Sequence, residues 1–282
     1  MHAPRLSAII VTCNRRRTLD LCLSQLARQS WSSETLEVLV VDDGSTDGTP
    51  DWLCVSRWPF ALRAFRTGHG PEVFGVMKGR NIALLHARGD LALFLDDDMI
   101  LHPDALHLIE ATHADWEARG EQVAVRGWFG QRRKKGPLHL WLRALTLSRY
   151  RPERERRRHP GFQDLEARRD DLEPRQAPIG MLSVPRQAAV KVDGFPEQAA
   201  VWGMDFEFQA RLKSMLGLRF VFEPRAYALH GPLPGDLTNR AYRRPLSEPP
   251  AAPRRGLSAY AGEDLSRFAL VAPAAARAGV GG

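Results

Sequence analysis

The chain has 282 residues, with 44% hydrophobic and 26% charged residues, a composition that predicts one large or two small globular domains with a sizeable core. The N-terminal apolar run AIIV is too short for a signal-peptide core, and no segment approaches the ~20 apolar residues of a bilayer span. Three cysteines without metal-site spacing indicate reduced thiols, so the sequence favours a cytoplasmic protein. The formal net charge is +7, and residues 131–158 hold eleven Lys or Arg against two Glu, a local excess of +9 that leaves the remaining chain at −2.

Strand and helix signals alternate along the chain. In chain order the sequence predicts a strand at Leu6–Thr12, a helix at Leu19–Leu26, a strand at Leu36–Val41, a short helix after Thr46 or Asp47, a strand at Ala61–Arg66, a helix at Arg80–Ala87, a strand at Leu91–Leu95, a helix opened by Pro103, a strand at Val123–Trp128, an ordered segment at Ala177–Val184, helices at Arg186–Val192 and Asp205–Leu216, and strands at Leu218–Phe222 and Ala226–His230. This alternation predicts an α/β fold with a parallel sheet.

Two segments depart from that pattern. A basic, Pro-containing insert at about 131–175 interrupts the domain predicted at 1–246. The tail at 247–282 is rich in Ala, Pro and Gly, and we expect it to be poorly ordered.

Polar side chains follow several predicted strands. Asn14 follows the first strand, Asp43 follows the second, and Asp96–Asp98 follow the strand LALFL. In parallel sheets ligands bind beyond the carboxyl ends of the strands. Three consecutive carboxylates repel one another unless a positive group lies among them, and a divalent cation is the natural candidate, although a solvated acidic turn is the plain alternative.

Four motifs in order carry a family resemblance: SAIIVTCNRRRTLDLCLSQL, VLVVDDGSTDGT, GRNIALLHARGDLALFLDDD and WGMDFEFQARL. Together they resemble glycosyltransferase family 2, whose members have the GT-A, Rossmann-like nucleotide-diphospho-sugar transferase fold, with a mostly parallel sheet flanked by helices. The resemblance spans about Leu6 to His230. It departs at Val11 and Cys13, where relatives carry proline and tyrosine, and at Met204, where they carry glutamate.

The resemblance implies a set of site residues. Those implied to bind a nucleotide sugar are Thr12, Asn14, Asp42, Asp43, Arg80, Asp96 and Asp97. A carboxylate at Asp43 can accept N–H groups of uracil or guanine, although DDGS alone is more often only a capped turn. Arg80 can pair with a diphosphate. Asp96, Asp98 and His230 are implied to hold Mn²⁺ or Mg²⁺, which would offset the charge on a departing diphosphate; a lone histidine is more often structural.

The fourth motif supplies a candidate base. The resemblance makes Asp205 the general base, favoured as an anion at a helix N-terminus, with a simple helix cap as the alternative. Glu207 is the fallback base, although two residues along a helix turn it well away from Asp205. Trp202 either stacks on an acceptor sugar or fills the core.

These residues lead to one favoured function and two rivals. The favoured function is metal-dependent transfer of a sugar from a nucleotide-diphosphate sugar, a UDP-sugar first, to an acceptor hydroxyl, with inversion by analogy, in the synthesis of a glycan, polysaccharide or glycolipid. A non-catalytic nucleotide-sugar binder is the first rival, suggested by Cys13 and Met204. A nucleotidyltransferase is the second, but it needs a Gly-rich triphosphate loop, and Asn14–Thr18 has no glycine.

The basic insert has three interpretations. Eleven cations in residues 131–158, near Trp128, Phe129 and Trp141, suit an anionic acceptor or a membrane surface bearing a lipid-linked acceptor. A solvated loop is the plain alternative. Nucleic acid is disfavoured because no nucleic-acid module accompanies the charge. The membrane interpretation places the protein at the inner face of a membrane as a peripheral protein.

Liposome co-sedimentation tests the membrane interpretation. If the insert contacts a membrane, the fraction bound to vesicles will rise with their content of anionic lipid and fall with added salt. Binding that is indifferent to lipid charge would remove this interpretation.

Overall fold

The computed structural model describes residues 4–70, 75–131, 160–197, 204–230 and 256–270. The basic segment at 132–159 and Trp202 lie outside these ranges, so the predictions made for them stay predictions.

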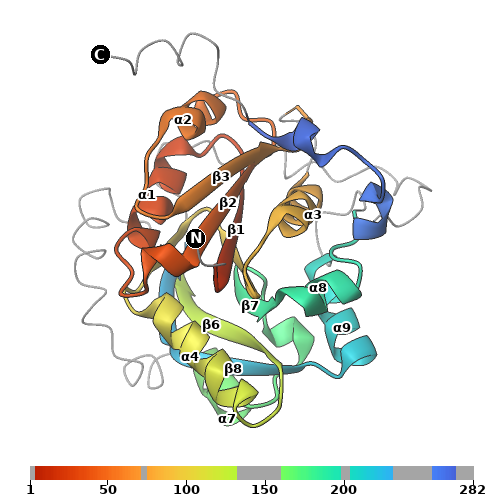
Figure 1. Cartoon of the computed structure of the whole chain (residues 1–282). Helices are drawn as coiled ribbons and strands as arrows, with labels where there is room; N and C mark the ends of the chain where they lie inside the picture. The colour runs from red at the N-terminus through yellow and green to blue at the C-terminus, as the bar shows by residue number, and fades with distance from the viewer. Residues whose placement is uncertain (1–3, 71–74, 132–159, 198–203, 231–255, 271–282) are drawn as a thin grey trace.

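An eight-stranded sheet runs through the described part of the chain in the order β3-β2-β1-β4-β7-β6-β8-β5 (Figure 1). Its strands are β1 Leu6–Thr12, β2 Leu36–Asp42, β3 Ala61–Arg66, β4 Leu91–Asp96, β5 Met99–Leu101, β6 Val123–Gln131, β7 Met181–Pro185 and β8 Arg219–His230. The first four strands in this order pair in parallel. Beyond them the sheet is mixed, because β7 runs antiparallel to β4 and β6 while β6 and β8 are parallel.

Helices cover both faces of the sheet. They are α1 Arg16–Leu26, α2 Thr49–Val55, α3 Val76–His86, α4 Ala105–Glu117, α7 Pro160–Ala167, α8 Arg186–Lys191 and α9 Met204–Leu216. One apolar cluster joins α1 and α4 to one face, and a second joins α3, α7, α8 and α9 to the other. Alternate residues of β1 enter the two clusters, which is why the strand reads as a continuous apolar run rather than as an alternation.

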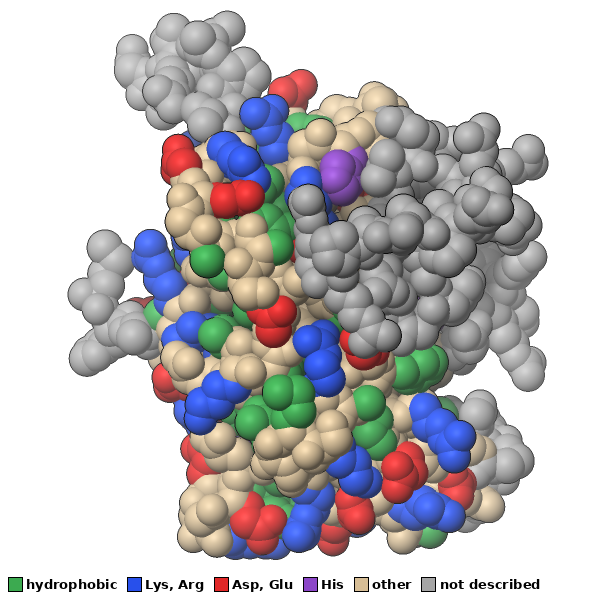
Figure 2. Space-filling model, turned by 90° about the vertical axis from the view of Figure 1, so that its right-hand side faces the viewer, with side chains coloured by type: hydrophobic (Ala, Val, Ile, Leu, Met, Phe, Trp, Pro, Cys, Tyr) green, Lys and Arg blue, Asp and Glu red, His purple; other side chains and the backbone are tan. Residues whose placement is uncertain are grey.

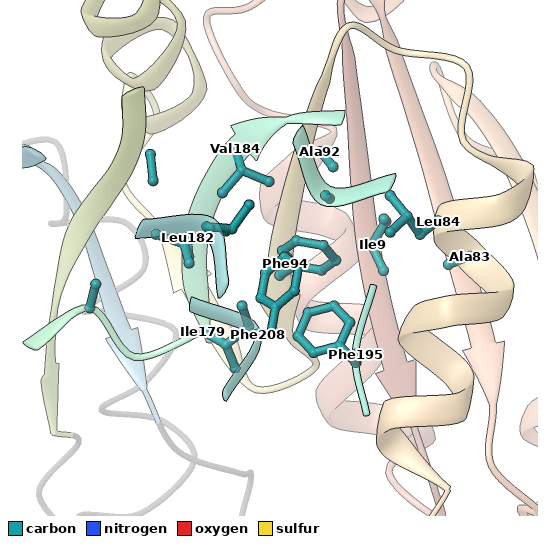
Figure 3. Packing of buried hydrophobic residues seen from close by; sticks show 14 of the residues in the cluster. Ile9, Ala83, Leu84, Ala92, Phe94, Ile179, Leu182, Val184, Phe195 and Phe208 are labelled. Atoms are coloured by element: carbon teal, nitrogen blue, oxygen red, sulfur yellow. The ribbon is translucent and has the colours of Figure 1, made fainter. Parts of the chain in front are cut away.

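Three phenylalanines fix α9 against the centre of the sheet (Figure 3). Phe195 and Phe208 stack with ring centroids 4.0 Å apart, and Phe94 of β4 meets Phe195 edge-on at 4.9 Å. All three side chains are fully buried. Through this cluster, the turn that follows α8 and the first half of α9 are tied to β4.

The α/β class and the predicted strands are confirmed, with two differences in detail. The segments predicted as separate strands at Leu218–Phe222 and Ala226–His230 form one long strand, β8, whose pairing with β6 shifts register between Gly127 and Trp128. The antiparallel pairing of β7 was not predicted, because strand direction depends on a connection that residue patterns do not specify.

Part of the tail contradicts the expectation of poor order. Within 247–282, residues 256–270 form two short 3-10 turns, Leu257–Tyr260 and Leu265–Phe268, whose side chains Leu257, Tyr260 and Phe268 are buried. The segment runs from the turn after α8 to the edge strand β3, where the N–H of Leu270 donates to the carbonyl of Ala64 (Figure 1). Because Ala, Pro and Gly dominate the tail, its composition gave no sign of the few apolar residues that pack against the domain.

On the described surface in Figure 2, acidic and basic side chains are intermingled rather than separated. This agrees with the near-neutral charge of the chain outside 131–158. No helix in the described ranges has the length and apolar character needed to cross a bilayer.

A buried histidine generates a prediction about stability. His113 of α4 is buried against the Ser183 hydroxyl at 2.9 Å, and burial lowers its pKa from 6.5 to about 3. Below pH 6.5 the unfolded chain therefore takes up a proton that the fold excludes. The contribution of His113 to the free energy of unfolding should fall by about 1.4 kcal/mol per pH unit from about pH 6.5 towards pH 3.

Urea unfolding of wild type and His113→Gln at several pH values measures this contribution as a difference. The difference in the free energy of unfolding between wild type and His113→Gln should narrow or reverse as the pH falls. His107→Gln, an exposed position on the same helix, serves as control and should leave the pH profile unchanged. A constant gap between wild type and His113→Gln across this range would contradict the prediction.

Candidate functional site

The acidic triplet lies where β4 ends, and its members face different partners. Asp96 and Asp98 approach His230 at the end of β8, whereas Asp97 faces Thr12 at the end of β1 and Arg15 just beyond it. Asp96 ends β4, whereas Asp97 and Asp98 form the turn between β4 and β5, so the three carboxylates leave the backbone in different directions.

Asp96, Asp98 and His230 form a compact cluster. Antiparallel pairing of β5 with β8 places Met99 opposite His230, which brings the histidine beside the triplet. His230 Nε2 lies 3.1 Å from Asp98 Oδ1 and 3.8 Å from Asp96 Oδ2. One potential ligand atom from each of the three residues lies within 4.8 Å of the others. The structure thus brings together the three residues predicted to hold a metal.

The charges of this cluster support one another. Burial would raise the pKa of Asp98, but the adjacent His230 and Arg15 outweigh burial and hold that pKa below its usual value. Burial would lower the pKa of His230, but Asp98 and Asp96 outweigh it and raise that pKa. Burial raises the pKa of Asp96 despite the nearby Arg80.

The cluster fits a divalent cation. Asp98 Oδ1 is enclosed and receives no well-directed hydrogen bond within the described chain, although His230 lies beside it. Two carboxylates and one imidazole provide the hard oxygen and nitrogen ligands that suit Mn²⁺ and, less closely, Mg²⁺.

Asp97, which was predicted to bind the nucleotide sugar, makes its hydrogen bonds within the protein. The Thr12 hydroxyl donates to its Oδ2 at 2.7 Å, and Arg15 Nη1 donates to its Oδ1 at 2.8 Å. Burial raises its pKa to about 6, against the opposing effect of Arg15. Both oxygens are therefore engaged inside the protein, and Asp97 joins the end of β1 to the end of β4. Thr12, also predicted to bind a ligand, is the other half of that contact.

Arg80 of α3 links the metal-ligand cluster to the candidate base. Its guanidinium lies 3.4 Å from Asp96 Oδ1 and 3.7 Å from Asp205 Oδ1. It also lies 5.5 Å from the centroid of the Phe195 ring, so the aromatic cluster packs against the guanidinium. The structure thus brings Arg80 and Asp205, which are far apart in sequence, to the same end of the sheet as Asp96.

Asp205 occupies the first turn of α9 and stays accessible, with its side chain 31% exposed. A carboxylate at this position is favoured by the unpaired backbone N–H groups of the helix end. Glu207 lies two positions further along the same helix, and Arg80 pairs with Asp205.

Asn14 and Asp42 hold the loops after β1 and β2 together. The Asn14 side-chain carbonyl accepts the N–H of Thr46 at 2.7 Å, and the Asn14 N–H donates to Ser45 Oγ at 2.8 Å. Asp42 accepts the N–H of Ser45 at 3.1 Å, and burial raises its pKa. These residues shape the sheet edge through internal hydrogen bonds, and Asn14 does so in the left-handed region, with φ of 53°.

Asp43 is enclosed, with an exposed fraction of 1%. The Thr67 hydroxyl donates to its Oδ1 and the N–H of Gly75 to its Oδ2, each at 2.7 Å. Burial raises its pKa to about 6. Each carboxylate oxygen accepts one of these hydrogen bonds and keeps a lone pair for a further donor.

Sequence reasoning did not predict a network of hydrogen bonds around the turn that follows α8. Asn81 pairs with both the N–H and the carbonyl of Phe195 at 2.8 Å, and its amide also donates to Glu197. The Tyr260 hydroxyl donates to the same Glu197 oxygen at 2.7 Å. Asn81 adjoins Arg80 in the matched motif, which was a usable signal, whereas Tyr260 belongs to a segment whose composition gave none.

Comparisons with known proteins show a family match. The family model described as "Glycosyl transferase family 2" matches residues 7–170, more than half of the chain. Validoxylamine A glucosyltransferase of Streptomyces hygroscopicus is 37% identical over 113 residues, which are 40% of this chain and 26% of that protein. The poly(ribitol-phosphate) beta-N-acetylglucosaminyltransferase TarS of Staphylococcus aureus is 33% identical over 117 residues, 39% of this chain and 20% of that protein. The chain therefore spans about a quarter or less of these curated relatives.

Solved structures share the fold. The mannosyltransferase PcManGT of Pyrobaculum calidifontis, in complex with GDP-Man and Mn²⁺, superposes with a TM-score of 0.59 at 24% identity, covering 86% of this chain and 61% of that one. A fragment of Staphylococcus aureus TarS superposes with a TM-score of 0.59 at 18% identity, covering 80% of this chain and 60% of that one. At this level of identity the likeness shows the fold alone.

The division within the triplet can be tested with two isosteric variants. Asp97→Asn removes the charge that pairs with Arg15, so it should lower the free energy of unfolding by about 1–3 kcal/mol and leave Mn²⁺ affinity close to wild type. Asp98→Asn should weaken Mn²⁺ binding by about tenfold or more.

Urea unfolding and Mn²⁺ titration followed by electron paramagnetic resonance measure the two effects separately. Equal loss of Mn²⁺ affinity in both variants would contradict the assignment of Asp97 to a structural role.

Proposed function

The chain belongs to glycosyl transferase family 2, and we propose that it transfers a sugar from a nucleotide-diphosphate sugar to an acceptor hydroxyl with Mn²⁺ or Mg²⁺ as cofactor. The observation that carries this proposal is the juxtaposition of Asp96, Asp98 and His230 with the Arg80–Asp205 pair. A cation held by the cluster would stabilise a diphosphate leaving group, and the partly exposed carboxylate would accept the proton of a hydroxyl nucleophile. One arginine, Arg80, lies between the two.

The donor is proposed to lie across the carboxyl ends of β1, β2 and β4. Asp96, Asp98 and His230 would hold the cation, which supplies positive charge to the departing diphosphate when bound. Solved relatives carry UDP, UDP-GlcNAc or GDP-Man, which supports a nucleotide-sugar donor, and a UDP-sugar is our first candidate.

Asp205 is proposed to act as the general base. Its carboxylate would accept the proton of the acceptor hydroxyl as the hydroxyl oxygen bonds to the anomeric carbon and the bond to the diphosphate breaks, which inverts the configuration in one displacement. Arg80 pairs with Asp205 and orients it, and it also pairs with Asp96. The Arg80 guanidinium thus sets the position of Asp96, beside the proposed leaving group, relative to Asp205, beside the proposed nucleophile.

Two variants separate donor binding from chemistry. Asp98→Ala should abolish Mn²⁺-dependent binding of UDP, because it removes a buried ligand from the cluster. Asp205→Asn should keep UDP binding and reduce donor turnover by about 10²–10⁴-fold, the usual contribution of a general base. Calorimetry with UDP and Mn²⁺, followed by nucleotide release from UDP-GlcNAc and GDP-Man, measures both.

Glu207→Gln is the matched control on the same helix and should retain turnover. If Glu207→Gln is inactive while Asp205→Asn is active, the base is Glu207. Undiminished turnover in both Asp98→Ala and Asp205→Asn would overturn the proposed function, and tight UDP binding without turnover in wild type would indicate a nucleotide-sugar binder.

A further inference from the structure

Arg126 of β6 is a buried cation that has no carboxylate partner among the described residues. Its side chain is 5% exposed. Nε and Nη1 are enclosed and have no hydrogen-bond acceptor, and no carboxylate in the described ranges pairs with the guanidinium. Burial lowers its pKa to about 10, so the group still carries its charge at neutral pH. A buried charge is costly unless something compensates it.

The other buried arginine near the site behaves differently. Arg80 is enclosed to a similar degree but lies between Asp96 and Asp205. Among the described residues, carboxylates pair with Arg80 and none pairs with Arg126. The guanidinium of Arg126 therefore stays available to a partner that the described residues do not provide.

Three aromatic rings surround the guanidinium. Its carbon lies 5.8 Å from the centroid of Trp128, 5.9 Å from that of Phe129 and 5.6 Å from that of Phe222. Strict alternation would put residues 126 and 129 on opposite faces of β6, but the register shift between Gly127 and Trp128 changes the phase of the strand. The rings attract the cation and exclude water, which would strengthen an ion pair formed there.

Arg126 and its three rings lie next to the proposed metal site, on the side away from the loops that follow β1 and β2. The Phe129 ring is 5.3 Å from the imidazole of His230. In the sheet, β6 lies two places from β4, in the direction opposite to β1 and β2 (Figure 1). A ligand that reaches Arg126 would therefore lie on the side of the proposed metal site opposite to the proposed donor loops.

We propose that Arg126 binds an oxyanion, a carboxylate or phosphate group, carried by the acceptor. The planar guanidinium presents N–H donors that match two oxygens of such a group. This inference rests on the proposed function only for the identity of the molecule that carries the anion; an oxyanion site at Arg126 can be tested independently.

The first experiment compares melting temperatures in sodium chloride and sodium phosphate at equal ionic strength. Arg126→Met removes an uncompensated buried charge, so in chloride it should melt about 2 °C or more above wild type. Phosphate should raise the melting temperature of wild type and have a smaller effect on Arg126→Met, because only wild type keeps the site.

Arg219→Met is the matched control. Arg219 also lies over a tryptophan ring, at 5.1 Å from Trp116, but it pairs with Glu121 at 3.4 Å. This variant should show no gain in chloride and keep the response to phosphate. If Arg126→Met melts below wild type and phosphate raises both equally, Arg126 is a structural cation held by the rings, and the inference is wrong.

The second experiment identifies the carrier. With UDP and Mn²⁺ present, glucuronate should bind wild type more tightly than glucose does, and Arg126→Met should lose about tenfold or more of that preference. Arg126→Lys keeps the positive charge but lacks the paired N–H donors of the guanidinium. It should lose less of the preference for glucuronate than Arg126→Met. UDP affinity should be the same in all variants, because the donor loops lie elsewhere.

If Arg126→Met instead loses preference between UDP-glucuronate and UDP-glucose, the oxyanion belongs to the donor, and the acceptor assignment is overturned. If wild type fails to bind UDP while phosphate still stabilises it through Arg126, the proposed function fails and the oxyanion site stands.

Discussion

The site depends on holding several carboxylates at one edge of a sheet without driving that edge apart. Asp96–Asp98 and Asp205 would repel one another strongly in a partly buried setting. Arg15 compensates Asp97 and Asp98, and Arg80 lies between Asp96 and Asp205. His230 faces the remaining oxygen of Asp98. Each cation reaches the edge from a different segment, so the fold itself neutralises the charge that the sequence concentrates.

This arrangement explains why an acidic triplet is more informative than its charge alone suggests. The middle carboxylate joins two strands through Thr12 and Arg15, and the outer two lie together beside His230. A structural contact at the centre of the triplet therefore orients the candidate ligands on either side of it. Rigidity at this point follows from buried, charge-assisted hydrogen bonds rather than from loop length.

The strands and the location of the site could be predicted because both depend on local pattern. Apolar runs that end in polar residues identified β1, β2 and β4, and the rule that parallel strands share a carboxyl edge placed Asn14, Asp43 and Asp96–Asp98 together. Long-range pairing could not be predicted in the same way. That Asp97 contacts Thr12, or that the segment 256–270 reaches Glu197 and β3, depends on connections whose course no residue pattern specifies.

The arginines show how pairing, rather than residue type, separates their roles. Arg15 and Arg80 lie near the site with carboxylate partners, so their charges are already used to hold the edge together. Arg126 lies on the other side of His230 with three rings and no carboxylate in the described ranges. A sequence shows all three only as basic residues. Only the contacts distinguish a charge that is paired within the fold from one that has no carboxylate partner among the described residues.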